Sequence, residues 1–321
     1  MNYDVTAMGE LLIDFTQNGV SEQGNYLFEA NPGGAPCNVL AMLNKLGKKT
    51  AFIGKVGDDL FGRLLIKVVS QAGIDISGLV SDTSSRTTLA FVQNSPDGDR
   101  DFSFYRNPGA DQMITSSEVR TDIIQNSKVF HFGTLSLTDE PARSATQSAV
   151  NAAAAAEVLI SFDPNLSPPL WHSLEEAKKQ MAWGCSQCKV LKIAEEELAF
   201  LTGKDTIAKG MVSLREQFPN IALILVTKGK NGAEAFFKDI HVAAPSYLEV
   251  KTIDTTGAGD TFCGSCLSYL IDHNLETLTE QQLASMLKFA NAAASLVTTK
   301  KGAILSMPTR AEIMQLIQNN N

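Results

Sequence analysis

One segment of the chain combines glycine and aspartate in an order suited to phosphate chemistry. Residues 254–262 read DTTGAGDTF, follow the strand-like run 248–253 and open an apolar helix predicted to end near residue 271. Gly257 and Gly259 lack side chains, so backbone N–H groups can approach an anion beside the positive end of the helix dipole. The pattern predicts a site that stabilises charge on a transferring phosphoryl group.

Asp260 lies at the mouth of this predicted site, where it could deprotonate an incoming hydroxyl. A general base of this kind contributes roughly 10²–10⁴ in rate. The alternative is a tight strand-to-helix turn with an N-capping aspartate and no catalytic role. Neither Gly-x₄-Gly-Lys-Ser/Thr nor a Gly-x-Gly-x-x-Gly after a strand occurs, so we expect neither a P-loop nor a dinucleotide fold.

A second set of glycines lies more than 200 residues earlier in the chain. Residues 33–38 read GGAPCN and residues 53–59 read IGKVGDD, with Leu46-Gly47 and Gly62 nearby. Together they resemble the first signature of the ribokinase-like (PfkB) carbohydrate kinases, and segment 254–262 is similar to that family's second signature. The resemblance extends over essentially the whole chain, including the runs 226–229 and 301–303.

Within that family the chain is most similar to fructokinases. The segments that carry this likeness are 8–10, 104–111, 133–137 and 163–166. Relatives that phosphorylate 2-keto-3-deoxygluconate share several of them. Many members of both groups have an arginine after Asp-Pro-Asn-Leu, where this chain has Ser167. Because a carboxylate-bearing substrate would miss that cation most, Ser167 favours a neutral sugar.

The order of the predicted elements agrees with an α/β fold. After residue 122, strands alternate with helices, which predicts a parallel sheet covered on both faces. Two strand-like runs, 87–92 and 101–106, flank the turn-rich stretch 94–99 and predict a β-hairpin. The resemblance implies one ribokinase-like domain over 1–321, with a central, mostly parallel sheet and a small β-sheet lid built from about 12–32 and 87–107.

The resemblance also implies which residues bind the two substrates. The sugar is expected under the lid, with Asp260 as the base and Gly257, Ala258 and Gly259 as the anion hole. The sugar-binding positions are Asp14, Gly33, Gly34, Asn38, Arg106 and Asp260. The ATP-binding positions are Lys192, Glu195, Thr227, Gly229, Gly232, Gly257, Gly259 and Asn291.

Two metal ions follow from the same likeness. Glu195 lies where the family orders Mg²⁺ through water, in keeping with the few direct protein ligands that this ion takes. A monovalent cation, K⁺, is implied beside the anion hole, held mostly by backbone carbonyls. Its positions are Asp254, Thr256, Val297, Lys300, Gly302 and Ser306. Relatives often have asparagine where Lys192 stands, and a lysine there could contact phosphate directly or be a surface charge.

Several polar residues have simpler interpretations. Glu196 and Glu197 are expected to be solvated helix charges, and His131 and His241 to be structural. The pairs Cys185/Cys188 and Cys263/Cys266 could bind zinc, but thiols three apart in an apolar helix are typically packing residues. The five cysteines and an N-terminus without a basic segment favour a reduced, cytoplasmic protein.

The formal charge of −8 argues against nucleic acid or an anionic membrane as a partner. The leading interpretation is phosphorylation of fructose at its 6-hydroxyl by ATP. Other PfkB substrates, such as 2-keto-3-deoxygluconate, ribose or a nucleoside, stay open, as does a kinase-like regulatory binder. A dinucleotide-dependent oxidoreductase is disfavoured, because the chain lacks the glycine fingerprint of that class. A homodimer formed through the lid is a further expectation from the family.

Overall fold

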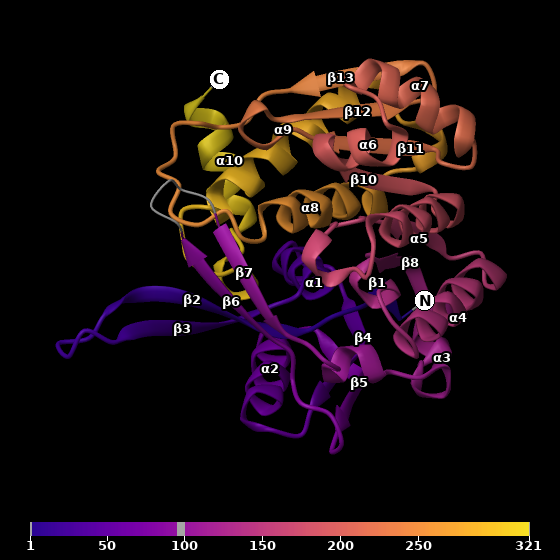
Figure 1. The fold of residues 1–321 in the computed structure, drawn as a ribbon. Helices are drawn as coiled ribbons and strands as arrows, with labels where there is room; N and C mark the ends of the chain where they lie inside the picture. The colour runs from indigo at the N-terminus through magenta and orange to yellow at the C-terminus, as the bar shows by residue number, and fades with distance from the viewer. Residues whose placement is uncertain (1, 95–99, 321) are drawn as a thin grey trace.

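The body of the protein is built on one large sheet. The structure, a computed structural model, describes residues 2–94 and 100–320. Within these residues, nine strands form a sheet in the order β13-β12-β11-β10-β9-β8-β1-β4-β5 (Figure 1). The strands are β1 Tyr3–Met8, β4 Thr50–Gly57, β5 Asp75–Asp82, β8 Ser127–Phe132, β9 Leu159–Phe162, β10 Val190–Ala194, β11 Leu223–Thr227, β12 Ala233–Phe237 and β13 Ile240–Ala244.

The sheet is parallel from β5 through β11 and ends in an antiparallel hairpin. β11 pairs antiparallel with β12, and β12 with β13. The predicted α/β class with a mostly parallel sheet is confirmed. The strict alternation of strand and helix expected after residue 122 is wrong beyond β11, because the short turn at 238–239 returns the chain directly into the neighbouring strand.

Helices cover both faces, and two hydrophobic clusters fill the spaces between. One face carries α1 Ala35–Lys45, α2 Leu60–Gln71, α8 Ala258–Asp272, α9 Glu280–Val297 and α10 Arg310–Asn319. The other carries α3 Thr121–Gln125, α4 Ala142–Ala155, α5 Leu174–Gln187, α6 Glu195–Thr202 and α7 Ile207–Gln217. Short 3₁₀ turns are η1 Ala110–Met113, η2 Ser116–Glu118, η3 Leu135–Leu137, η4 Pro168–Leu170, η5 Gly229–Asn231, η6 Leu275–Thr277 and η7 Ile304–Ser306. Alternate residues of one strand point to opposite faces: Val129 joins the first cluster, Phe130 the second.

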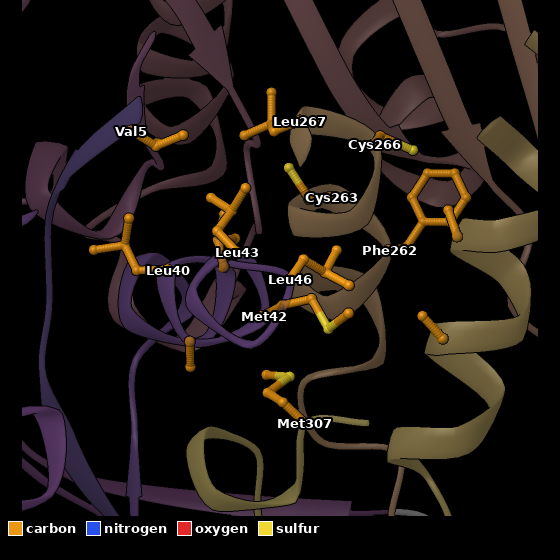
Figure 2. Packing of buried hydrophobic residues seen from close by; sticks show 14 of the residues in the cluster. Val5, Leu40, Met42, Leu43, Leu46, Phe262, Cys263, Cys266, Leu267 and Met307 are labelled. Carbon is orange, nitrogen blue, oxygen red and sulfur yellow. The ribbon is translucent and has the colours of Figure 1, made fainter. Parts of the chain in front are cut away.

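α8 lies against α1 in the core (Figure 2). A Cβ on Gly264 would come within 2.8 Å of the Val39 carbonyl oxygen, so the glycine permits this close approach. Cys263 and Cys266 are free thiols buried in the same cluster. Among the described residues, no group of three or more His, Cys, Asp or Glu is arranged to hold a metal ion. The burial of Cys263 and Cys266 in this cluster agrees with the packing interpretation.

A four-stranded sheet projects from the body (Figure 1). It has the order β3-β2-β6-β7 among the described residues, with β2 Leu12–Val20, β3 Tyr26–Gly33, β6 Leu89–Asn94 and β7 Arg100–Tyr105. We call it the lid sheet. β2 pairs antiparallel with β3 and parallel with β6. Most of the turn predicted over 94–99 lies outside the described residues.

The two faces of the lid sheet differ in polarity. Asp14 and Asn31 are cross-strand partners on one face. On the other, the ring of Phe91 stacks on Phe15 at 4.8 Å and meets Phe28 and Tyr105 edge-on. One face can therefore contact a polar ligand, and the other is suited to apolar contacts.

The strand predicted over 248–253 is wrong. These residues form an irregular loop, and Leu248 and Ile253 are 67% and 56% exposed. The backbone N–H groups of Ile253 and Asp254 both donate to the Thr298 carbonyl, at the end of α9, and not to a neighbouring strand. The β-branched and apolar residues of this segment produce a strand-like pattern, but the segment pairs with no strand among the described residues. Across the described residues, no helix is both long and apolar enough to cross a bilayer.

Candidate active site

The N-terminus of α8 forms a cradle of backbone groups. Gly257 is the N-cap residue and has φ 77°, a left-handed conformation that favours glycine. Its carbonyl accepts hydrogen bonds from the N–H and the hydroxyl of Thr261. The N–H of Gly259 has no acceptor among the residues that the structure describes. An unused donor at a helix N-terminus is a place where an anion can bind.

Asp260 lies in the first turn of α8 and is 8% exposed. Its Oδ2 accepts a hydrogen bond of 2.8 Å from Nδ2 of Asn38, which comes from α1. Burial raises the pKa of the Asp260 carboxyl, although the Asn38 hydrogen bond and the positive charge of Lys192 lower it in part. A carboxylate with a raised pKa is a better base once ionised. The structure therefore brings the predicted base and Asn38 together.

Lys192 extends from β10 toward the same cradle. A Cβ on Gly259 would be 3.1 Å from the Lys192 Nζ, so the ammonium group lies directly beside the glycine. Its partner is Asp163, whose two oxygens are 3.1 and 3.0 Å away. Burial lowers the pKa of Lys192, but the carboxylates of Asp163, Glu197 and Asp260 outweigh burial and raise it. Lys192 is therefore a buried, charged group, and the surface-charge alternative is wrong.

Asp163 belongs to a sequence motif that carried no predicted role for it. Burial raises the pKa of Asp163, and the positive charge of Lys192 lowers it in part. The signal lay in the sheet register: Val190 pairs with Ser161 and Leu191 with Phe162, so Lys192 follows beside Asp163. Residues at the carboxyl ends of paired parallel strands lie side by side. Which strands pair, however, cannot be predicted from either segment alone.

Glu197 is not the solvated charge that the sequence suggested. Its two oxygens accept hydrogen bonds from the backbone N–H groups of Leu166 (2.7 Å) and Ala194 (2.8 Å). The side chain thus links the loop after β9 to the start of α6 and holds both near Lys192. Its spacing from Ala194 is that of a capping-box glutamate, which is a readable signal.

A pocket of about 280 Å³ opens beside the α8 N-terminus. Its walls come from the β11–β12 turn, the 246–255 loop, α8 and α9. The lining includes five of the predicted nucleotide positions, and these are Thr227, Gly229, Gly232, Gly259 and Asn291. It also includes Tyr247, Leu248 and Phe262, apolar residues that the sequence did not single out. A largely apolar slot that ends at an anion cradle can take a nucleotide base and its phosphates.

Asn291 lines the pocket but its amide is already bonded within the protein, and Glu195 lies outside the pocket. Asn291 donates both amide hydrogen bonds to the carbonyls of Ala244 (2.9 Å) and Pro245 (3.0 Å), so it shapes the wall of the pocket. Glu195 begins α6 and lines another hollow, together with Glu196 and the 204–207 segment that leads into α7. The structure therefore does not bring Glu195 into the lining of the 280 Å³ pocket.

The predicted sugar-binding residues meet where the lid sheet joins α1. A Cβ on Gly33 would lie 2.5 Å from the Asp14 Oδ2, so any side chain there would displace this carboxylate. Gly34 has φ 131°, and a Cβ there would meet the Glu10 backbone oxygen at 2.4 Å. Asn38 Oδ1 is a buried acceptor without a hydrogen-bond partner among the described residues. A ligand hydroxyl could supply the missing donor.

Glu10 lies in segment 8–10, for which the sequence predicted no role at the site. In the structure it holds the turn between β3 and α1. Its Oε1 accepts a 2.7 Å hydrogen bond from the N–H of Ala35 at the start of α1. Burial raises the pKa of Glu10 to about 8, helped by the charge of Asp111 and opposed by Arg106. Glu10 thus fixes the segment that carries Gly34 and Asn38.

Arg106 is buried in a network of its own. Its Nε donates to Asp111 Oδ2 at 2.8 Å, Nη1 to the Thr138 hydroxyl at 2.9 Å and Nη2 to the Leu135 carbonyl at 2.9 Å. Both charged side chains of the Arg106–Asp111 pair are 2% exposed. Arg106 is therefore not a solvated strand-end charge. Its predicted contact with the sugar stays a prediction.

The predicted monovalent-cation positions lie on two loops that meet. Asp254 Oδ1 accepts from the N–H and hydroxyl of Thr256, and its Oδ2 from the N–H of Gly302 at 3.1 Å. Val297 ends α9, Ser306 donates to the Lys301 carbonyl at 2.6 Å, and the ammonium of Lys300 is directed toward Glu312. The two loops are adjacent to the α8 cradle, because a Cβ on Gly257 would touch that of Ala303.

The two histidines that were expected to be structural have protein partners. His131 is buried beside the Ser161 hydroxyl at 3.2 Å, and burial together with Lys192 lowers its pKa to about 3. The exposed His241 contacts Glu234 at 2.7 Å and stacks on Phe236.

The arrangement of base, cradle and cation agrees with the relationships of the chain to known proteins. The model of the "pfkB family carbohydrate kinase" matches residues 2–310. The chain belongs to this family. The resemblance inferred from the two signatures is thereby confirmed. Fructokinase-1 from Zea mays is 44% identical over 316 residues, which is 98% of this chain and 97% of the maize protein.

Solved structures of PfkB kinases superpose closely on this fold. The fructokinase from Xylella fastidiosa with bound ATP has a TM-score of 0.90 at 29% identity, covering 100% of this chain and 99% of that one. A double mutant of the Vibrio cholerae O395 fructokinase, with fructose, ADP and a potassium ion bound, has a TM-score of 0.87 at 31% identity. That match covers 98% of this chain and 99% of the Vibrio protein. The ribokinase-like fold is confirmed.

Proposed function

We propose that this PfkB kinase is a fructokinase that transfers the γ-phosphate of ATP to the 6-hydroxyl of D-fructose. The observation that carries the kinase chemistry is the placement of Asp260. A buried carboxylate, oriented by Asn38, lies in the first turn of a helix that begins with an anion cradle. The extensive identity with the maize fructokinase supports fructose as the acceptor.

Asp260 acts as the general base. In its ionised form it accepts the proton of the sugar's primary hydroxyl as the hydroxyl oxygen attacks the γ-phosphorus in line with the leaving ADP. Its raised pKa makes the proton transfer more favourable. The hydrogen bond from Asn38 keeps the carboxylate in one orientation, and orientation is a large part of the rate gain in phosphoryl transfer.

The cradle and Lys192 stabilise the negative charge of the phosphoryl group during transfer. The N–H of Gly259 has no acceptor among the described residues and lies near the Lys192 ammonium, so an anionic phosphoryl group bound between them would meet both. Burial strengthens these interactions and fixes them in advance. Asp163 and Glu197 hold Lys192 charged and in position.

Mg²⁺ would neutralise the charge of the ATP phosphates. Among the described residues there is no cluster of three or more ligating side chains, which fits an ion held largely by phosphate oxygens and water. Glu195 is the residue proposed to orient that water. The proposed K⁺ site is the junction of the 254–256 and 297–306 loops, and its loss would loosen the cradle. Replacing K⁺ by choline should then lower kcat, and unchanged activity would exclude this site.

The environment of the sugar site favours a neutral substrate. Arg106, proposed to reach the sugar, and Lys192, beside the anion cradle, are each already paired with a carboxylate. Ser167 stands where an arginine would face a substrate carboxylate. The Asp14 carboxylate and the Asn38 Oδ1 are hydrogen-bond acceptors. Acceptors suit the hydroxyl groups of a sugar and disfavour a substrate carboxylate. These features argue for fructose over 2-keto-3-deoxygluconate.

The substrate is tested by ADP release with MgATP and a panel of fructose, ribose and 2-keto-3-deoxygluconate. We expect kcat/KM for fructose to exceed that for the acid by at least tenfold, the value of one unmatched charged hydrogen bond. A preference for the acid would contradict the choice of fructose and leave the kinase mechanism intact. A protein that binds ATP and sugar without turnover would instead be a regulatory binder.

The aromatic face of the lid sheet supports a homodimer. The exposed apolar side chains on this face include Tyr26, Phe28 and Tyr105. Two such faces packed together would shelter them from water, as exposed apolar patches of this kind commonly do in oligomers. The buried, free cysteines agree with a cytoplasmic location, which stays a prediction.

A further inference from the structure

A second hollow lies between α8, α9 and α10, on a part of the body that the proposed reaction does not use. Its volume is about 370 Å³, and none of its lining residues also lines the nucleotide pocket. This volume falls within the lower range for sites that hold small molecules. The α8 residues that line it are Ser265, Ser268, Tyr269 and Asp272, spaced as one helix face.

The hollow contains a buried polar atom that lacks a partner. Ser265 is 1% exposed, and its hydroxyl makes no hydrogen bond with any described residue. Burying an unsatisfied hydroxyl is unfavourable by about 1–3 kcal/mol. Ser268 and Ser285 add two further hydroxyls to the lining. Hydroxyls both donate and accept, so the group is suited to a ligand that carries hydroxyls itself.

Flat aromatic surfaces form the apolar part of the wall. Tyr269 stacks on His273 with ring centroids 3.9 Å apart, and Phe289 carries the Arg310 guanidinium 5.4 Å above its ring. Rings of this kind bind the apolar C–H face of a sugar while leaving its hydroxyls to polar partners.

The charged groups at the hollow favour an anion. Arg310 and Lys288 contribute positive charge, and the Asp272 carboxylate is already paired with Lys48. Arg310 presents a planar fork that matches phosphate oxygens in two hydrogen bonds. Cation, aromatic rings and buried hydroxyl therefore converge on one small space.

We propose that this hollow is a second ligand site that binds a small phosphorylated sugar. The phosphate pairs with Arg310, the ring packs on Phe289 and Tyr269, and a sugar hydroxyl satisfies Ser265. The site is independent of the sugar that the kinase phosphorylates, so it goes beyond the proposed function.

A ligand here would contact both helices that border the catalytic loops. α8 begins at the anion cradle, and α10 follows the 302–307 segment. Thr261 joins the two regions, because its hydroxyl donates to the Gly257 carbonyl at 2.7 Å and contacts the Met307 sulfur at 3.2 Å.

The test is calorimetric titration of the full chain whose active site is first saturated with fructose, Mg²⁺ and a non-hydrolysable ATP analogue. Fructose 6-phosphate, glucose 6-phosphate, AMP and inorganic phosphate are the probes. We expect at least one sugar phosphate to bind at or below ~1 mM. Arg310→Gln should weaken its binding roughly tenfold or more, and Ser265→Ala should weaken it several-fold.

Arg215→Gln is the matched control. Arg215 lines another hollow of about 370 Å³, which has no buried unpartnered hydroxyl among the described residues, so this change should leave binding unaltered. The proposal is overturned if no sugar phosphate binds the saturated protein, or if both hollow variants bind as the unaltered chain does. Equal affinity for inorganic phosphate or a preference for AMP would also overturn it, because sugar recognition would then be absent.

Discussion

Lys192 and Asp163 form a buried ion pair beside the anion cradle. The ammonium lies beside Gly259, and its buried partner prevents it from turning elsewhere. The segment 254–262 was enough to predict Asp260 and the two glycines, because the motif carries its own geometry. Asp163 could not be assigned a partner in the same way, because its contact with Lys192 arises only when β9 and β10 pair.

Replacing Lys192 by methionine should reduce kcat with fructose by about 10²–10³, the usual effect of removing one preorganised group that stabilises transition-state charge. Methionine keeps most of the side-chain volume. Asp163→Asn serves as the comparison, since it retains the ammonium and should cost much less activity. The measurement is coupled ADP release at saturating substrates. A Lys192→Met enzyme within about threefold of the original rate would contradict the role of the ammonium.

Glu10 predicts a pH dependence of folding stability. The folded protein keeps the Glu10 proton up to about pH 8, whereas the unfolded chain releases it near the ordinary glutamate pKa of 4.5. Stability from this group is therefore present at low pH and is lost as pH rises toward 8. Between pH 6 and pH 8 the loss should be about 2–3 kcal/mol.

The free energy of unfolding, measured by urea denaturation at both pH values, checks this prediction. Glu10→Gln retains an acceptor for the Ala35 N–H and cannot ionise. The variant should therefore show a decline with pH that is smaller by the same amount. Parallel declines in the two proteins would show that Glu10 ionises normally in the folded state.

At the scale of elements, the turn between β3 and α1 and the start of α8 together make the sugar site. The residues of both segments were assigned to the site from the two family signatures, and Pro36 lies in the first turn of α1, where proline is well tolerated. The predicted strand at 248–253 failed because strand-like residues there line a ligand pocket as a loop. Local pattern identifies which segments are apolar, but only the neighbouring strands decide which of them join a sheet.

Gly33→Ala tests the element-level geometry. The added methyl group would lie 2.5 Å from the Asp14 Oδ2, while the backbone of Gly33 is not in the left-handed region. The carboxylate must move, so we expect KM for fructose to rise about 10-fold or more, in line with the cost of overpacking. KM for ATP should stay unchanged. A change in both constants would indicate a general disturbance of the fold.

At the scale of the whole molecule, the lid sheet has one polar face and one aromatic face. The hairpin over 87–106 was predicted from the sequence, and the family resemblance implied one lid built from about 12–32 and 87–107. That β2 pairs with β6, and in parallel, was not predicted. That pairing joins residues far apart in the chain, such as Asp14 and Ala90. It also creates the continuous aromatic face on which the proposed dimer depends.

Tyr105→Lys should break that dimer. Tyr105 is 67% exposed at the edge of the aromatic face, and burying an unpaired lysine in an interface is unfavourable. Sedimentation velocity should show a dimer for the original chain and a monomer for the variant. Leu174→Lys, the same kind of change at an exposed position at the start of α5, should leave the dimer intact. A monomeric original chain would exclude the dimer outright.

The central claim is that Asp260 removes the proton of the sugar hydroxyl, and one comparison tests it most directly. Fructose-dependent ADP release is measured for the original chain and for Asp260→Asn, which preserves the side-chain shape and an acceptor for the hydrogen bond from Asn38. The account predicts that kcat falls by about 10²–10⁴ while affinity for ATP is unchanged. Turnover close to the original rate in Asp260→Asn would contradict the account.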